Sequence, residues 1–203
     1  MRNNWLLIGA FLLISLNSIA QTTALDWYNQ GTSKGLSEDY SGAIDCFSKA
    51  LSIQPDFEDA LFNRGVCLFR KRQYKIALVD FNALLTKNPE SARAYNQRGL
   101  IKAGLGDNNG ALADFNDAIA LKNNDFYFYY NRAISNNALG FFGEAINDLN
   151  VCIELDSKQA KAFYKRGIFS YVSGLKEAGC IDLRKAAELG YSEAYDILRI
   201  YCR

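Results

Sequence analysis

The chain repeats itself every 34 residues, and this period limits its possible folds more than any other feature. Small residues recur at this step in two series, which are Gly31, Gly65, Gly99, Ala133 and Gly167, and Ala43, Ala77, Ala111, Ala145 and Gly179. Large residues recur in two more, which are Trp27, Leu61, Tyr95, Tyr129 and Phe163, and Phe47, Phe81, Phe115, Leu149 and Leu183. A fixed period of this length, without insertion or deletion, is typical of proteins whose units each pack on their neighbours.

The order of residues within one period resembles the tetratricopeptide repeat. A large residue, a small residue, an alanine and a second large residue follow one another, and Pro55 and Pro89 close the first two units. Asn123, Ser157 and Tyr191 replace this proline in the later units. The resemblance implies an all-α, right-handed α-solenoid of about five helix-turn-helix units. It places the repeats within residues 21–191, as units 24–57, 58–91, 92–125, 126–159 and 160–191, followed by a C-terminal capping helix over 192–203.

The small residues are explained by close helix crossings. Glycine inside a helix costs about 0.5–1 kcal/mol relative to alanine, so its recurrence needs a reason. In each unit, a side chain larger than alanine would hold the two helices apart, and we expect Gly99 and Ala111 to be such contact points. Gly106, Gly140 and Gly174 fall at the turns between helices, where glycine permits a positive φ.

Residues 1–20 have the three parts of a secretory signal peptide. Arg2 is followed by an apolar run from Trp5 to Leu16, and small residues stand at Ser18 and Ala20. The run has about 12 residues, whereas spanning a bilayer takes roughly 20. We therefore expect cleavage near Ala20 and a periplasmic or secreted protein that is not inserted in the membrane afterwards. An uncleaved anchor is the alternative interpretation.

Arginine and aspartate form a second pattern within the repeats. An arginine directly precedes the small crossing residue in units two to five, and an aspartate follows sixteen residues later. The residues are Arg64, Arg98, Arg132 and Arg166, with Asp80, Asp114, Asp148 and Asp182. Unit one has Gln30 and Cys46 instead, so both members are missing together. We predict Arg–Asp pairs that join the two helices of each unit, and the alternative is an arginine ladder that binds a ligand.

Export also changes how the five cysteines are interpreted, because disulfides persist outside the cytosol. Cys180 and Cys202 lie on the last two predicted helices, at nearly equal distances from the turn near Gly190. They could meet and tie down the capping helix, and the alternative is two small buried apolar residues. Cys46, Cys67 and Cys152 occupy core-like positions, and we expect them to be packing residues. The Cys46, Cys67 and Cys152 thiols form no CxxC or Cys/His arrangement.

In the family that this sequence resembles, the first helices line a concave groove that usually binds peptides. The register places these residues in the groove: Tyr28, Asn29, Phe62, Asn63, Arg70, Arg93, Asn96, Gln97, Tyr127, Tyr130, Asn131, Lys161, Tyr164 and Lys165. One amide recurs in each of the first four units, and it carries both a donor and an acceptor that match a peptide backbone. Neighbouring rings supply apolar contact area. The alternative is that these amides are only solvated polar residues on a helix face.

One subclass of the family grips a C-terminal carboxylate with a clamp of Lys, Asn and Arg. Asn131, Lys161 and Lys165 match the second half of this clamp. Leu100 and Asn96 stand where its first half needs an asparagine and a lysine, so the clamp is incomplete and we reject it. The groove nevertheless has a basic end.

The composition favours binding over catalysis. The chain has no histidine, which removes the commonest general base and metal ligand. Its formal net charge is +1, so it has little electrostatic attraction for nucleic acid. We predict a non-catalytic scaffold without metal or cofactor, a monomer or weak oligomer, whose partner is a protein or extended peptide. The alternative is a structural or self-assembling envelope protein that stacks through its ends.

Overall fold

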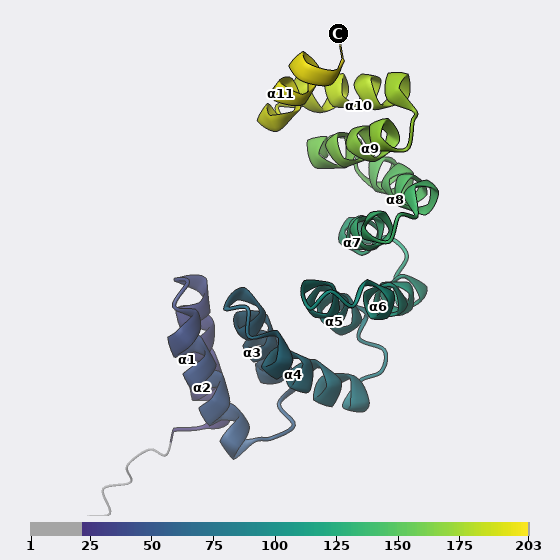
Figure 1. Cartoon of the computed structure of the whole chain (residues 1–203). Helices are drawn as coiled ribbons and strands as arrows, with labels where there is room; N and C mark the ends of the chain where they lie inside the picture. Colours follow the sequence, from purple (N-terminus) through teal and green to yellow (C-terminus); the bar gives the residue numbers. More distant parts are fainter. Residues whose placement is uncertain (1–21, 203) are drawn as a thin grey trace, which may run out of the picture.

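The computed structural model describes residues 22–202, and that part of the chain is folded into helices joined by short turns. Figure 1 shows them following one another along a single arc. The helices are α1 (Ala24–Leu36), α2 (Tyr40–Ile53), α3 (Glu58–Arg70), α4 (Tyr74–Lys87), α5 (Ala92–Gly104), α6 (Asn108–Leu121), α7 (Phe126–Ala138), α8 (Phe142–Leu155), α9 (Ala160–Val172), α10 (Lys176–Glu188) and α11 (Ser192–Tyr201). The prediction of an all-α solenoid of helix pairs with an added C-terminal helix is confirmed.

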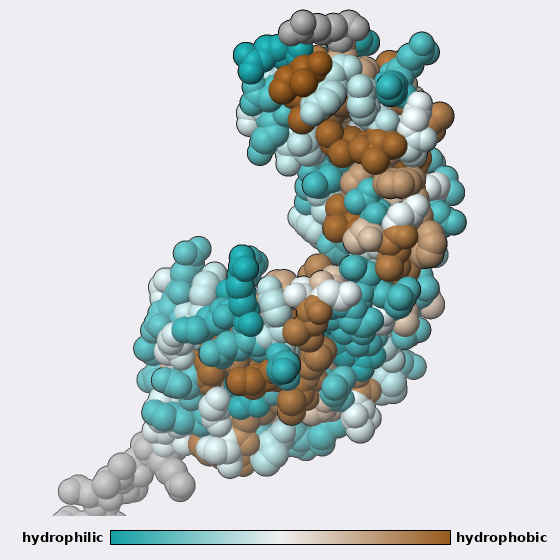
Figure 2. Space-filling model, in the orientation of Figure 1, coloured by the Kyte–Doolittle hydropathy of each residue, from teal (hydrophilic) through white to brown (hydrophobic). Residues whose placement is uncertain are grey.

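Helices α1 to α10 form five antiparallel pairs that begin at Ala24, Glu58, Ala92, Phe126 and Ala160, each 34 residues after the last. In Figure 1, α3, α5 and α7 lie toward the inside of the arc, and α4, α6 and α8 lie toward the outside. The space-filling view in Figure 2 shows an open hollow between the two ends. The predicted signal peptide over 1–20 lies outside the described residues. None of the helices within 22–202 has the length and apolar character needed to cross a membrane.

Phenylalanine rings fill the space that the first series of glycines leaves. Phe47, Phe81 and Phe115 are almost fully buried. A Cβ atom added to Gly99 would lie 2.6 Å from Cε1 of Phe115, and Gly31 and Gly65 face their own rings in the same way. In units one to three, the missing side chain of the glycine therefore makes room for a phenylalanine ring, and not for the close approach of a second backbone. In unit four, where Ala133 replaces glycine, the smaller Leu149 replaces the ring.

Unit five uses its glycines for a direct approach of two backbones. A Cβ added to Gly167 would lie 2.9 Å from the carbonyl oxygen of Gly179 and 2.9 Å from Cγ of Leu183. Neither Gly167 nor Gly179 has room for a methyl group without moving α9 away from α10. The α9–α10 crossing therefore matches most closely the expectation that small residues allow two helices to approach each other.

Alanine at Gly167 should destabilise the protein, whereas alanine at Gly143 should not. Gly167→Ala is expected to lower the free energy of unfolding by about 1–3 kcal/mol, because the added methyl overpacks the α9–α10 crossing. Gly143 also lies in a helix, but its added Cβ would meet nothing within 4 Å. Gly143→Ala should therefore raise stability by about 0.5 kcal/mol. Urea unfolding followed by far-ultraviolet circular dichroism measures both, and equal midpoints would contradict the close approach at Gly167.

Candidate peptide-binding groove

The predicted groove residues lie on the first helices of the five pairs, but their exposure differs widely. Asn29, Arg70, Arg93 and Tyr127 are exposed. Those of intermediate exposure are Tyr28, Phe62, Asn63, Gln97, Tyr130, Asn131, Lys161, Tyr164 and Lys165. Asn96 is only 7% exposed, so it belongs mainly to the packing between units.

Two of the cavities along this inner surface adjoin each other. The larger has a volume of about 450 Å³ and lies between α3, α5 and α7. Its lining includes Arg70, Arg93, Gln97, Tyr127 and Asn131. A second cavity of about 290 Å³ adjoins it toward the N-terminal end, and Arg93 lines both. The groove is thus a row of neighbouring hollows, lined by side chains from successive units.

Two of the recurring amides are already used between units. The Asn63 Nδ2 donates to the Tyr28 hydroxyl at 3.1 Å, and the Asn131 Nδ2 donates to Oδ1 of Asn96 at 2.9 Å. Each bond joins one first helix to the first helix of the preceding unit. We predicted amides that match a ligand backbone, and the structure gives Asn63 and Asn131 an additional structural role. Whether they also contact a ligand stays a prediction.

Several of the predicted contact rings are also partly committed to packing. The ring of Tyr28 packs against Phe57, with centroids 4.9 Å apart. Tyr164 stacks on Tyr191 at 4.5 Å. Burial raises the pKa of the Tyr130 phenol to about 12, which reflects how far this ring is removed from solvent. Tyr127, which is 54% exposed, is the most accessible of the predicted rings.

Cations of the groove lie over these rings. The Arg93 guanidinium lies 4.7 Å from the centroid of Phe62. Lys161 Nζ lies 4.3 Å from the centroid of Tyr127, and 4.9 and 5.2 Å from those of Phe126 and Tyr130. Each contact reaches back to the preceding unit, so cation–π attraction adds to the cohesion between units. Sequence register placed these cations in the groove but could not show that rings hold them.

The predicted Arg–Asp pairs are present in all four units. The distances from arginine Nη2 to aspartate Oδ1 are 2.6, 2.7, 2.6 and 2.7 Å in units two to five. Nε of each arginine bonds the other carboxylate oxygen, which makes the pair bidentate. The bond to Asp114 raises the pKa of Arg98, and the bond to Asp148 raises that of Arg132. These guanidinium groups are therefore occupied by structural partners.

The third nitrogen of each arginine makes a bond that the sequence analysis missed. Nη1 donates to the second helix of the preceding unit, where the acceptors are Ser48, Asn82, Asn116 and Asn150. Each arginine thus joins three helices, two within its own unit and one in the unit before. The four acceptors are themselves 34 residues apart in the sequence, and this spacing was the signal that could have identified the contact. This series ends at Arg184, which carries no acceptor oxygen on its side chain.

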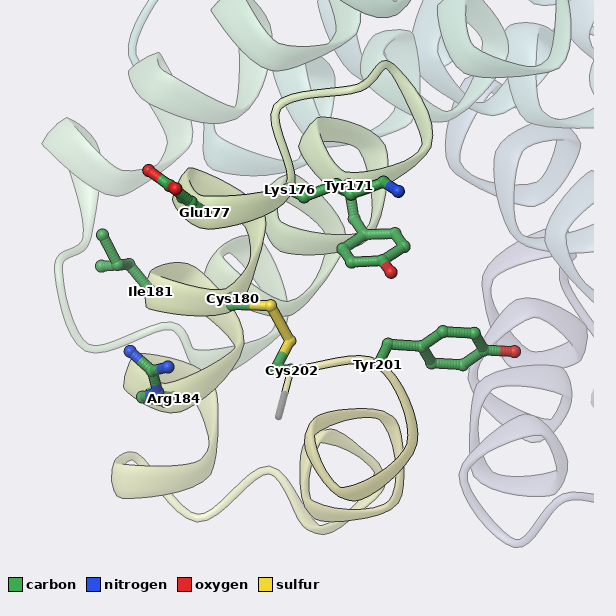
Figure 3. Close-up of a pocket in the computed structure, with 8 residues that line it drawn as sticks. All are labelled: Tyr171, Lys176, Glu177, Cys180, Ile181, Arg184, Tyr201 and Cys202. Carbon is green, nitrogen blue, oxygen red and sulfur yellow. A yellow bond between two sulfur atoms is a disulfide. The ribbon is translucent and has the colours of Figure 1, made fainter.

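The last helix is tied to α10 by a disulfide between Cys180 and Cys202, whose Cα atoms are 5.6 Å apart. Figure 3 shows the bond beside a cavity of about 320 Å³. Tyr171 and Tyr201 lie on one side of it, and Ile181 lies along α10 on the other. Cys46, Cys67 and Cys152 are buried free thiols. Burial raises the pKa of Cys152 to about 12, as expected for a packing residue.

The comparisons with known proteins agree with this geometry. Models of the tetratricopeptide repeat match residues 28–92 and 92–125. The chain is a tetratricopeptide-repeat protein. Of the two units beyond residue 125, unit four has Ala133 at its crossing, and both lack the closing proline, as unit three does. No protein of curated function matches the sequence.

Solved tetratricopeptide-repeat structures share the fold at low sequence identity. A crystal structure of MamA is 22% identical, covers 81% of this chain and 96% of its own, and has a TM-score of 0.73. YrrB, described as a TPR protein with an unusual peptide-binding site, is 21% identical, with coverages of 89% and 94% and a TM-score of 0.72. A thermophilic TPR protein of Thermus thermophilus, TTC0263, is 16% identical, with coverages of 85% and 99% and a TM-score of 0.69. Among residues 22–202, no group of His, Cys, Asp or Glu side chains could hold a metal ion.

Proposed function

We propose that this tetratricopeptide-repeat protein is a non-catalytic scaffold that holds an extended protein segment along its concave surface. The observation that carries the proposal is the row of hollows on the inner helices, of about 450 and 290 Å³. They are lined by amides, rings and cations from successive units, and the smaller one also by the carboxylates of Glu58 and Asp59. Such a lining offers backbone hydrogen bonds and apolar contact in repeated steps, which suits an extended chain. YrrB, which shares the fold, is described as having a peptide-binding site.

We also propose that the scaffold acts in the periplasm or outside the cell. The signal-peptide pattern of residues 1–20 supports export. The disulfide of the last two helices adds support, because such bonds are rare in reducing compartments. N-terminal sequencing of the protein recovered from its host tests this. A chain that begins close after Ala20, found outside the cytoplasm, is the expected result, and a cytoplasmic chain that retains Met1 would contradict it.

Crosslinking from the two surfaces tests the groove. A photoreactive residue at Tyr127, which is 54% exposed inside the arc, should capture the partner in the native host. The same residue at Val79, which is 64% exposed on α4, is the matched control. We avoid Asn63 and Asn131 because both hold neighbouring units together.

The captured segment is then identified by mass spectrometry and synthesised as a peptide. It should bind the purified protein, and Tyr127→Ala should weaken that binding. Capture from Val79 alone would place the partner on the outer surface and overturn the groove proposal.

A further inference from the structure

We propose that the groove prefers acidic segments, and that Arg93 and Lys161 are the two groups that read their carboxylates. This inference rests on the proposed function and names the chemistry of the partner. Arg93 and Lys161 hold the same position in units three and five. Each is fixed over rings of the preceding unit, as described above. Because the rings already hold the side chains, less conformational freedom is lost when a ligand binds.

The groove cations lack acidic partners, in contrast to the cations between helices. Each of the four arginines that join the helices of a unit, which are Arg64, Arg98, Arg132 and Arg166, is bound by an aspartate. Within residues 22–202, no carboxylate oxygen lies within 4 Å of the charged nitrogens of Arg70, Arg93, Lys161 or Lys165. No carboxylate of the described residues therefore pairs directly with these groove cations, although Glu58 and Asp59 line the smaller cavity beside Arg93.

The large cavity shows the same imbalance. Arg70 and Arg93 both line it, with Asp125 as the acidic residue of the lining. That carboxylate is engaged at the start of α7, where it accepts a bond from the backbone of Tyr127 at 3.0 Å and one from Lys122 at 3.4 Å. A carboxylate of a ligand would find two guanidinium donors in this cavity, together with the amides of Gln97 and Asn131.

The observations favour a peptide over a nucleic acid as the source of the negative charge. Single-stranded nucleic acids bind by stacking bases on free aromatic faces. Here Arg93 covers a face of the Phe62 ring. Lys161 lies over the rings of Phe126, Tyr127 and Tyr130. The near-neutral charge of the whole chain also gives little attraction for a polyanion.

The positions of the two cations set the spacing of the acidic residues. Adjacent packed helices are about 8–10 Å apart, so two units along the inner surface correspond to roughly 20 Å. An extended chain rises about 3.3 Å per residue, which places the two carboxylates about six residues apart. Asp59 occupies the equivalent position in unit two, so acidic preference should not extend to the N-terminal end of the groove.

Three peptides of about twelve residues, in a neutral polar background, test this spacing. One carries two aspartates six positions apart, one carries two adjacent aspartates, and one carries asparagines. Calorimetric titration of the full chain at about 0.1 M salt should show roughly tenfold tighter binding of the first than of the third. The adjacent pair has the same charge and should bind less tightly than the first peptide, because it cannot reach Arg93 and Lys161 at the same time. Equal binding of all three would overturn the proposal.

Variants assign the effect to the two cations. Arg93→Met and Lys161→Met keep the contact with the rings and remove the charge, and each should reduce binding of the first peptide about fivefold or more. Lys161→Arg should retain it. Lys75→Met removes an exposed cation from α4 and should change nothing. An unchanged far-ultraviolet circular dichroism spectrum and cooperative thermal unfolding of the variants exclude misfolding, and unchanged affinity in both Met variants would overturn the proposal.

Two further results separate this inference from the proposed function. If an oligonucleotide or anionic lipid vesicles bind as tightly as the first peptide and lose binding in the same variants, the assignment to peptide is wrong. If the partner captured from Tyr127 is not acidic and binds equally well to Arg93→Met and Lys161→Met, the acidic preference is wrong and the groove function stands.

Discussion

Replacing Asp114 by asparagine should lower the free energy of unfolding by about 3 kcal/mol, because it leaves two cations between helices without their partner. Asp114 is 1% exposed. It accepts two bonds from Arg98, and Lys102 lies 2.9 Å from its Oδ2 atom. Asparagine has nearly the same size, so the loss reports charge and hydrogen bonding rather than packing. The Arg98 side chain would also hold its neighbour Asn82 less firmly.

Denaturant unfolding of Asp114→Asn and of a matched control checks this expectation. Glu154→Gln removes an exposed carboxylate from α8 and should change stability by less than about 0.5 kcal/mol. Adding Arg98→Met to Asp114→Asn should recover part of the loss, since one unpaired charge is then removed. An Asp114→Asn variant as stable as the Glu154→Gln variant would show that the pair has no part in stability.

Removing the disulfide should cost about 3 kcal/mol in the stability of the C-terminal end, as is typical for a closed loop of this length. Cys180 and Cys202 are 22 residues apart. The cap has little packing of its own, since Ala194 is the one residue of α11 that is buried. Tyr201, the last residue of α11, is 53% exposed. In a solenoid each unit packs only on its neighbours, so the loss should be concentrated in α10 and α11.

Hydrogen exchange of Cys202→Ala checks where the loss occurs. Protection should fall in α11 and the end of α10 and persist in α3 to α6. Cys180→Ala and the double variant should match the single variant, because all three remove the same bond. Intact mass under non-reducing conditions, with and without alkylation, shows directly whether the bond forms. A double variant much less stable than either single one would indicate separate packing roles instead.

The sequence predicted the fold because its repeat is regular, and it predicted best what is local to one unit. The Arg64–Asp80 pair lies within a single unit, and the missing pair in unit one identified its partners. Bonds between units were harder to predict. Nothing in a lone asparagine shows that Asn63 reaches Tyr28 or that Asn131 reaches Asn96, because such contacts depend on the rotation from one unit to the next. The series from Ser48 to Asn150 had the right step, but polar residues on exposed helices rarely identify a contact.

The groove was predicted only as a surface. The repeat register showed which residues face inward, but not which of their side chains are buried in contacts between units. Asn96 and Tyr130 are recognisable as packing residues only when the neighbouring unit is in place. Lys161 could be placed at a basic end of the groove, yet its position among three rings depends on Phe126 of the preceding unit. Ligand contacts at these positions stay predictions.

The arginine series starts and stops within this one molecule. Gln30 stands where an arginine would reach toward an earlier unit, and Arg184 stands where an acceptor would receive a later one. In a second copy added end to end in the same geometry, Gln30 would stand opposite Arg184, so the arginine bond that joins successive units within the chain would be missing at that junction. The bond that holds neighbouring units together inside one molecule therefore contributes nothing to such a contact between molecules.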